Sequence, residues 1–124
     1  MVKLIALLKR KPALTPKEFE RRWLEEHTLI SAQLPGLLAY RINISTARQP
    51  AGTQTEPLYD GTAEMWWESV DAMEASFESA IGVAAGADAD QFAEVRIHVY
   101  TEEHVVLPGP VDASRTKRPA HPRT

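Results

Sequence analysis

The order in which two hydrophobic periods follow one another constrains the fold of this chain more than any other feature. Apolar residues alternate, or fill a short segment, over residues 2–9, 37–46, 59–67 and 96–107, a pattern typical of β-strands. Between the first and second of these segments, and again between the third and fourth, the period lengthens to that of an amphipathic helix. The sequence therefore predicts the order β-α-β-β-α-β.

The first helical segment has a well-marked start and an apolar stripe. Thr15 can cap the helix, Pro16 suits the first helical position, and Glu18 completes a capping box. At about 100° per residue, the inward stripe carries apolar side chains and one histidine. Its members are Phe19, Trp23, His27, Ile30 and Leu34.

The second helical segment is divided in the sequence. Ser69 can cap a helix, and apolar residues repeat every four positions after it. Gly82 and Gly86 then interrupt the pattern. A second helix is expected to begin at Asp88, with Gln91 as its capping-box partner.

This order of elements is that of the split β-α-β motif. We therefore expect an α+β, ferredoxin-like fold, with one four-stranded antiparallel sheet and the helices on a single face. The domain is expected to cover residues 1–107. Residues 108–124 hold four of the nine prolines and four basic side chains against one acidic. Because this composition builds no core, we expect a Pro-rich basic C-terminal tail there.

Composition excludes several classes of protein. The 124 residues include no cysteine, which removes disulfide frameworks, thiolate zinc sites and iron–sulfur clusters. Fourteen basic against seventeen acidic side chains argue against a nucleic-acid-binding protein. No apolar segment approaches the ~20 residues that span a bilayer. The chain carries no recognisable signal-peptide core, so a cytoplasmic protein without membrane contact is expected.

The sequence also gives no sign of a bound cofactor or metal. It lacks the glycine-rich motifs that bind nucleotide, nicotinamide or flavin groups, and it lacks the His-Glu-x-x-His zinc motif. His98, Glu102 and His104 share one face of the last strand. Alternate residues on a strand lie ~6.6 Å apart, which is too far for three ligands of one ion. We therefore expect no cofactor and no metal site.

Five blocks of sequence, in order and at compatible spacing, resemble the EthD family of dimeric α/β-barrel proteins over roughly residues 1–107. They are VKLIALLKRKPALTPKEFERRWLEEH, LPGLLAY, YDGTAEMWWES, DADQF and EEHVV. The resemblance implies that two ferredoxin-like subunits pair as a homodimer, with a pocket between each sheet and its helices. The family is linked to the oxidative breakdown of ethers. Its relatives include methylmuconolactone methylisomerase and cofactor-free polyketide cyclases and oxygenases.

The resemblance also bears on the candidate catalytic residues. The isomerase carries a histidine and a tyrosine at the positions matched here by His27 and Tyr40. Two features differ: His27 is followed by Thr28-Leu29 where many members have Ala-Pro, and the chain has no counterpart of the isomerase's pocket cysteine.

The residues themselves point to the same pair. His27 titrates near neutral pH and lies on an apolar stripe, so it is a candidate acid and base. Tyr40 lies on the strand face that turns toward the helices, where its hydroxyl could bond a ligand carbonyl. The alternative readings are a core histidine held by a backbone carbonyl and a tyrosine that only packs. The expected walls of a substrate pocket are Trp23, Trp67, Met65 and Ile42.

Three functions remain open at this point. The first is a small cofactor-free enzyme, an isomerase, cyclase or oxidoreductase of a degradative or biosynthetic pathway. It would act by acid–base chemistry on a hydrophobic, ring-sized carbonyl compound such as a lactone, a quinone or a polyketide intermediate. The second is an accessory protein that binds an intermediate for a separate oxygenase. The third is a structural dimer without a ligand. In each case a homodimer is expected, because a sheet with helices on one face leaves its other apolar face bare.

Overall fold

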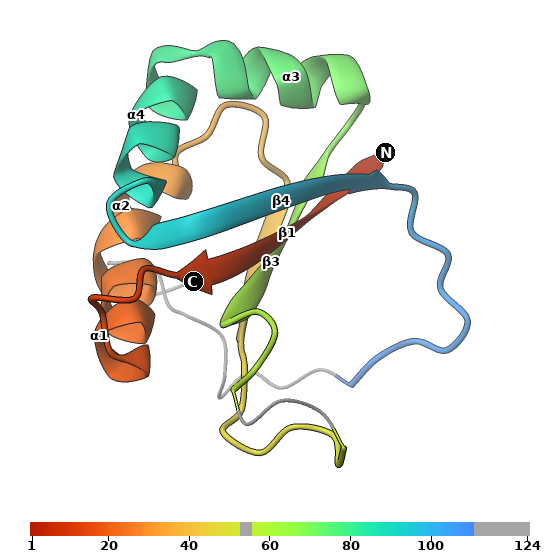
Figure 1. The fold of residues 1–124 in the computed structure, drawn as a ribbon. Coiled ribbons are helices and arrows are strands. Elements are labelled where there is room, and N and C mark those ends of the chain that lie inside the picture. Colours follow the sequence, from red (N-terminus) through yellow and green to blue (C-terminus); the bar gives the residue numbers. More distant parts are fainter. Residues whose placement is uncertain (53–55, 111–124) are drawn as a thin grey trace, which may run out of the picture.

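The computed structural model of the protein describes residues 1–52 and 56–110, and it places a four-stranded sheet beside a layer of helices (Figure 1). The strands are β1 (Val2–Arg10), β2 (Ala39–Ile44), β3 (Gly61–Trp67) and β4 (Ala93–Thr101). The helical segments are α1 (Pro16–Arg21), η1 (Arg22–His27), α2 (Thr28–Ser31), α3 (Val70–Glu78) and α4 (Ala80–Ala89). Of the expected tail at 108–124, residues from 111 onward lie outside the described part of the chain.

The sheet has the strand order β2-β3-β1-β4, and each pair of neighbours is antiparallel. One helical region links β1 to β2, and a second links β3 to β4. The predicted α+β, ferredoxin-like fold is therefore confirmed. In the described part of the chain, no helix combines the length and apolar composition needed to cross a membrane.

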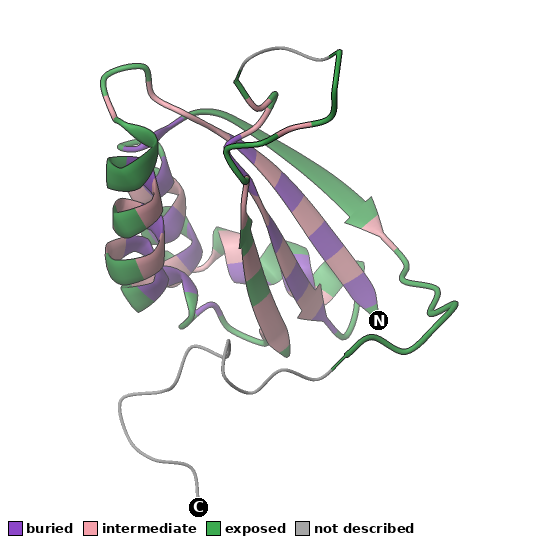
Figure 2. Cartoon of the chain, turned by 90° about the horizontal axis from the view of Figure 1, so that it is seen from below, coloured by how far each residue is buried: buried purple, intermediate pink, exposed green. Residues whose placement is uncertain are grey.

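The central strand β1 shows which face of the sheet the helices cover. Leu4, Ala6 and Leu8 point toward the helices and are buried, whereas Ile5 and Leu7 on the opposite face are half-buried. Figure 2 shows this alternation along the inner strands, while the edge strand β4 is exposed over most of its length. The helices thus cover one face only, and no helix of the described residues covers the apolar side chains of the other face.

Two of the three predicted helix caps, at Thr15 and Ser69, are present. The Glu18 backbone N–H donates to the Thr15 hydroxyl at 3.1 Å, and the Thr15 N–H donates to the Glu18 carboxylate at 2.8 Å, which completes the capping box. At the start of α3, the Ser69 hydroxyl accepts from the Ala72 backbone N–H at 3.1 Å. Local sequence therefore fixes where these two helices begin.

The first helical region differs from a regular α-helix in its middle, where residues 22–27 form a π-helical segment. A π-helical turn holds more residues than an α-helical turn. Side chains four positions apart consequently come closer to one line along the helix. Trp23, His27 and Ser31 are all buried, whereas Ile30, which the α-helical period places on the inward stripe, is only half-buried.

The second helical region corrects the sequence prediction that a helix begins at Asp88. Ser79 has extended backbone between α3 and α4, and its hydroxyl accepts from the Gly82 backbone N–H at 3.1 Å. α4 therefore begins at Ala80, and Asp88 lies in its last turn. Gly82 and Gly86 lie inside this helix and do not interrupt it.

The last strand also begins and ends earlier than the predicted range 96–107. Thr101 pairs with Lys3 of β1, and β1 itself begins at Val2. Beyond Lys3, only Val2 of β1 remains, so β1 offers almost no further residues with which β4 could pair. Val106, in the block that resembles the closing strand of the family, is 90% exposed.

The core between sheet and helices consists of two clusters that meet at Tyr40. One centres on aromatic rings, with Phe19 packed 5.4 Å from Trp23 and 5.6 Å from Phe92, centroid to centroid. The other surrounds the fully buried Trp67. Tyr40 packs against both clusters.

The two glycines of α4 allow a matched test of the fold. A Cβ at Gly82 would overlap the carbonyl oxygens of Ser76 and Phe77, whereas a Cβ at Gly86 would meet no atom within 4 Å. We predict that Gly82→Ala destabilises the protein by about 1–3 kcal/mol, because the helix connection must shift. Gly86→Ala should stabilise it by about 0.5–1 kcal/mol, because alanine favours a helix interior.

Urea unfolding of the two variants beside the wild type would measure both free energies of unfolding. Equal effects from the two substitutions would contradict this account of the packing between α3 and α4.

Candidate active site

A cavity of about 80 Å³ lies between the inner face of the sheet and the helices. The residues that β1 and β3 contribute are apolar, the helical side carries His27 and Ser31, and the two edge strands add Tyr40 from β2 and Arg96 and His98 from β4. Among the described residues, no aspartate or glutamate lines it. The lining residues are Leu4, Ala6, Leu8, Trp23, His27, Ser31, Leu34, Tyr40, Ala63, Met65, Phe77, Gly82, Ala85, Gly86, Ala89, Arg96 and His98.

His27 is held in place by a carboxylate from another helix. It is the last residue of η1 and only 8% exposed, and its Nδ1 lies 2.8 Å from Oδ2 of Asp88 on α4. Arg22 holds the same carboxylate with two bonds, Nη2 to Oδ1 at 2.7 Å and Nη1 to Oδ2 at 3.2 Å. The Arg22 guanidinium, with His27 as a smaller contributor, keeps the pKa of Asp88 below its usual value.

This arrangement sets the protonation of the imidazole. Because an ionised Asp88 can only accept, Nδ1 of His27 carries the proton and Nε2 is left with a free lone pair. Burial lowers the pKa of His27, and the nearby Asp88 offsets only part of that effect. The ring is therefore neutral at neutral pH and able to accept a proton at Nε2.

Tyr40 reaches the cavity from β2. Its hydroxyl lies 2.9 Å from the Ser31 hydroxyl, which in turn donates to the His27 carbonyl oxygen at 3.2 Å. Ser31 therefore accepts from Tyr40, so that one serine joins the tyrosine to the backbone of the histidine. Burial raises the pKa of Tyr40 and keeps it a neutral hydrogen-bond donor.

The structure brings four of the six predicted site residues to this cavity. His27, Tyr40, Trp23 and Met65 line it, whereas the other two face elsewhere in the core. Trp67 is fully buried, donates its indole N–H to the Pro35 carbonyl at 3.0 Å and packs 5.3 Å from the Phe77 ring. Ile42 packs against the aromatic cluster around Trp23.

Five polar residues of the site were not among the predicted catalytic or pocket residues: Arg22, Ser31, Asp88, Arg96 and His98. Ser31 follows His27 by four positions, but the α-helical period turns it away from the inward stripe. Asp88 is read there as a helix cap, and its contact with His27 spans 61 positions. Arg96 and His98 lie two apart on β4, opposite Leu8 and Ala6 of β1, so the strand period predicts that both share the inward face.

In the described part of the chain, no three histidine, aspartate or glutamate side chains gather closely enough to hold a metal ion. His104 and Glu102, considered above as ligands, lie 3.7 Å apart with side chains about 80% exposed. The His27–Asp88–Arg22 cluster contains one imidazole, one carboxylate and one cation, a set suited to proton transfer more than to metal binding.

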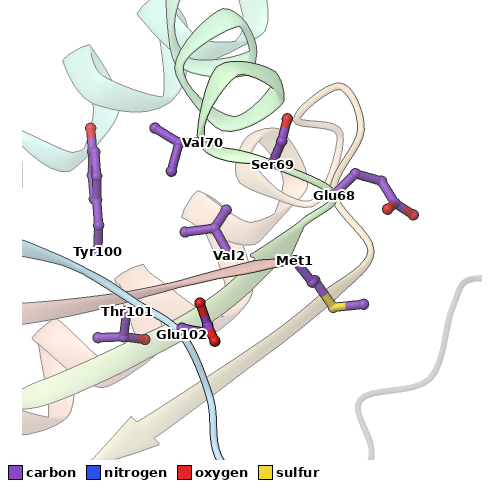
Figure 3. A pocket seen from close by; sticks show the side chains of 8 residues that line it. All are labelled: Met1, Val2, Glu68, Ser69, Val70, Tyr100, Thr101 and Glu102. Carbon is purple, nitrogen blue, oxygen red and sulfur yellow. The ribbon is translucent and has the colours of Figure 1, made fainter.

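A second, wider depression of about 380 Å³ lies at the end of the sheet, where β1 and β4 meet the start of α3 (Figure 3). Its polar groups are Glu68, Ser69, Tyr100, Thr101 and Glu102. The Ser69 hydroxyl is engaged in capping α3. Because no imidazole lines this depression, it is a weaker candidate for acid–base catalysis.

A four-stranded antiparallel sheet with its helices on one face is the ferredoxin-like fold, and two solved proteins with this fold are described as dimeric. An EthD domain matches residues 11–96, and the chain belongs to the EthD family. An EthD family protein from Bacillus halodurans is 26% identical, with a TM-score of 0.70, and the match covers 84% of this chain and 99% of that one.

Two further solved structures share the fold at lower identity. A dimeric ferredoxin-like protein of unknown function from Bacteroides fragilis is 17% identical, with a TM-score of 0.61, over 82% of this chain and 95% of that one. SnoaB, a cofactor-independent oxygenase from Streptomyces nogalater, is 13% identical, with a TM-score of 0.59, over 87% and 97%. No curated protein matches the chain in sequence.

The electrostatics of His27 give a direct test of the site. We predict that NMR titration places the pKa of His27 below its ordinary value of 6.5, and that Asp88→Asn lowers it further. The substitution removes the negative charge that favours the imidazolium and leaves the Arg22 cation uncompensated beside it.

The matched control is Asp71→Asn, which removes an exposed carboxylate from the first turn of α3. This variant should leave the titration of His27 unchanged. A His27 pKa that rises in Asp88→Asn would contradict the assigned hydrogen bond.

Proposed function

We propose that this EthD family protein is a small cofactor-free enzyme that transfers a proton at a carbon next to a carbonyl group of a hydrophobic, ring-sized compound. The observation that carries the proposal is a buried, neutral histidine, oriented by a carboxylate, on the wall of an apolar cavity. A histidine that served only packing would need no such pair of charged supports.

In the proposed step, Nε2 of His27 takes a proton from the carbon beside the carbonyl. The electron pair of that C–H bond moves to the carbonyl oxygen and forms an enolate. The Tyr40 hydroxyl donates to this oxygen, and for that its proton turns away from Ser31. His27 then returns the proton at another carbon, so the reaction balances as an isomerisation without a redox partner.

The supporting group around His27 has a defined part in this step. When His27 becomes an imidazolium, Asp88 faces a positive charge across a distance of 2.8 Å. Arg22 fixes the orientation of that carboxylate, because its guanidinium donates one hydrogen bond to each of the two carboxylate oxygens. Asp88 is thus proposed as a positioning residue and His27 as the catalytic one.

The fold supports the proposal in one further respect. SnoaB, described as a cofactor-independent oxygenase, has the same fold. At 13% identity the two proteins share the fold, and quinones and polyketide-like rings are therefore tested beside lactones.

To test the function, a thermal-shift screen against lactones, quinones and aromatic acids would first identify compounds that stabilise the fold. For each of these, proton abstraction would be followed in D₂O as the exchange of ligand C–H for C–D. We predict that His27→Ala slows this exchange by about 10²–10⁴-fold. Tyr40→Phe should slow it less, because its ring still packs against both core clusters.

His104→Ala, at an exposed histidine outside the cavity, is the matched control and should exchange at the wild-type rate. Wild-type exchange in His27→Ala would overturn the catalytic assignment. Binding without any exchange would instead favour the accessory protein that holds an intermediate for a separate oxygenase.

We also propose that two copies of the chain pair through the uncovered face of the sheet. Solved structures with this fold are described as dimeric. On this face, Ile5 and Leu7 of β1 lie opposite Val99 and Ile97 of β4, and both β4 side chains are exposed. Burying this patch against a second copy would remove it from water.

Sedimentation equilibrium should therefore give about 28 kDa, twice the 13.8 kDa of the chain. Ile97→Glu should shift the protein toward the monomer, because it would bury a carboxylate in an apolar interface. Val83→Glu, an exposed position on α4, should remain dimeric. A wild-type mass near that of one chain at micromolar concentration would contradict the proposed dimer.

A further inference from the structure

The cavity carries a charge pattern that points to the chemistry of its ligand. The chain as a whole is acidic, with seventeen acidic and fourteen basic side chains, yet no described carboxylate lines the cavity. One permanent cation, Arg96, lines it beside two imidazoles, His27 and His98, and burial lowers the pKa of both imidazoles. An anionic ligand group would therefore meet a guanidinium and no described carboxylate in this cavity.

The guanidinium of Arg96 and the imidazole of His98 stand together at the β4 end of the cavity. Arg96 and His98 lie two residues apart on the face of β4 that turns toward the helices, opposite Leu8 and Ala6 of β1. The His98 ring packs 5.7 Å from that of Phe77, centroid to centroid, which holds it beside the cavity.

Arg96 can be redirected to a ligand at little cost. Its guanidinium pairs with Asp90 at 2.6 Å, and the Asp90 side chain is 65% exposed. Exposed ion pairs of this kind contribute at most about 1 kcal/mol to stability. A ligand carboxylate in the cavity, partly shielded from water, would compete well for the planar guanidinium, which binds carboxylates with two parallel hydrogen bonds.

Small side chains line the middle of the cavity on both the sheet side and the α4 side, and this part is named the alanine-lined slot. Ala63, Ala6 and His98 stand in one row across β3, β1 and β4. The opposite wall comes from α4, where Ala85, Gly86 and Ala89 also have small side chains or none. Of the possible ligand shapes, a planar group is the one best matched to two walls of small side chains, and Trp23 and Tyr40 line the same cavity.

We infer that the ligand of this cavity is a planar, conjugated ring that carries a carboxylate, with the ring in the alanine-lined slot and the carboxylate bound by Arg96 and His98. The inference rests on the proposed function for the carbonyl at the other end, near His27 and Tyr40, but the binding of the carboxylate does not depend on catalysis. It makes Arg96 a determinant of specificity for acids over neutral analogues.

Benzoate and benzamide are suitable probes, because they share the ring and differ in charge. NMR titration of the full-length protein would give both dissociation constants and map the shifted signals. We expect benzoate to bind about tenfold more tightly than benzamide, a difference of about 1.4 kcal/mol, and to shift the amide signals of Ala6, Ala63 and Ala85. Arg96→Gln should remove most of this preference.

Arg48→Gln is the matched control, since it deletes the same charge at an exposed site of the loop between β2 and β3. It should keep the wild-type preference. Equal affinities for the two probes, a failure of benzoate to bind, or an equal loss in both variants would overturn the inference. Loss of C–H exchange in His27→Ala with no preference for benzoate would leave the proposed function standing and this ligand class refuted.

Discussion

The pairing of β1 with both of its neighbours is the constraint on which the rest of the structure depends. Every residue from Lys3 to Leu8 has a partner in β3 on one side and in β4 on the other. This double pairing fixes which side chains of β4 stand beside the cavity, although β4 itself is exposed along most of its length. A shift of one residue would turn Arg96 and His98 to the uncovered face and bring Ile97 inward.

The cavity exists because the core is built from residues of unequal size. Large rings, among them Phe19, Trp23 and Phe92, fill one part of the space between sheet and helices. Trp23 lies so close to the sheet that a Cβ at Gly61 would come within 2.6 Å of its ring. Where the facing residues are alanines and glycines, the two layers cannot meet, and a slot is left. The tightly packed aromatic rings therefore keep the sheet and the helices apart, and this separation leaves the neighbouring cavity open.

The fold and four of the six predicted site residues follow from local patterns in the sequence. Strand and helix periods gave the order of elements, and the phase of β2 and the first helix turned Tyr40 and His27 inward. What the sequence did not reveal depends on distant contacts or on a changed helical period. Asp88 meets His27 across 61 positions, and Ser31 turns inward only because of the π-helical segment before it. Trp67 lies on the predicted face of its strand, but its indole N–H donates to the Pro35 carbonyl and its ring does not line the cavity.

The charged partners of His27 solve a problem that burial creates. An isolated imidazole in an apolar wall would be free to adopt either tautomer and to rotate, and only one arrangement presents Nε2 with a lone pair. An ionised Asp88 selects that tautomer, but a carboxylate beside an apolar cavity would itself tend to take up a proton. Arg22 prevents this by pairing with the same carboxylate. Since Arg22 and His27 are the two ends of the π-helical segment, one local change of helical period places both of them against α4.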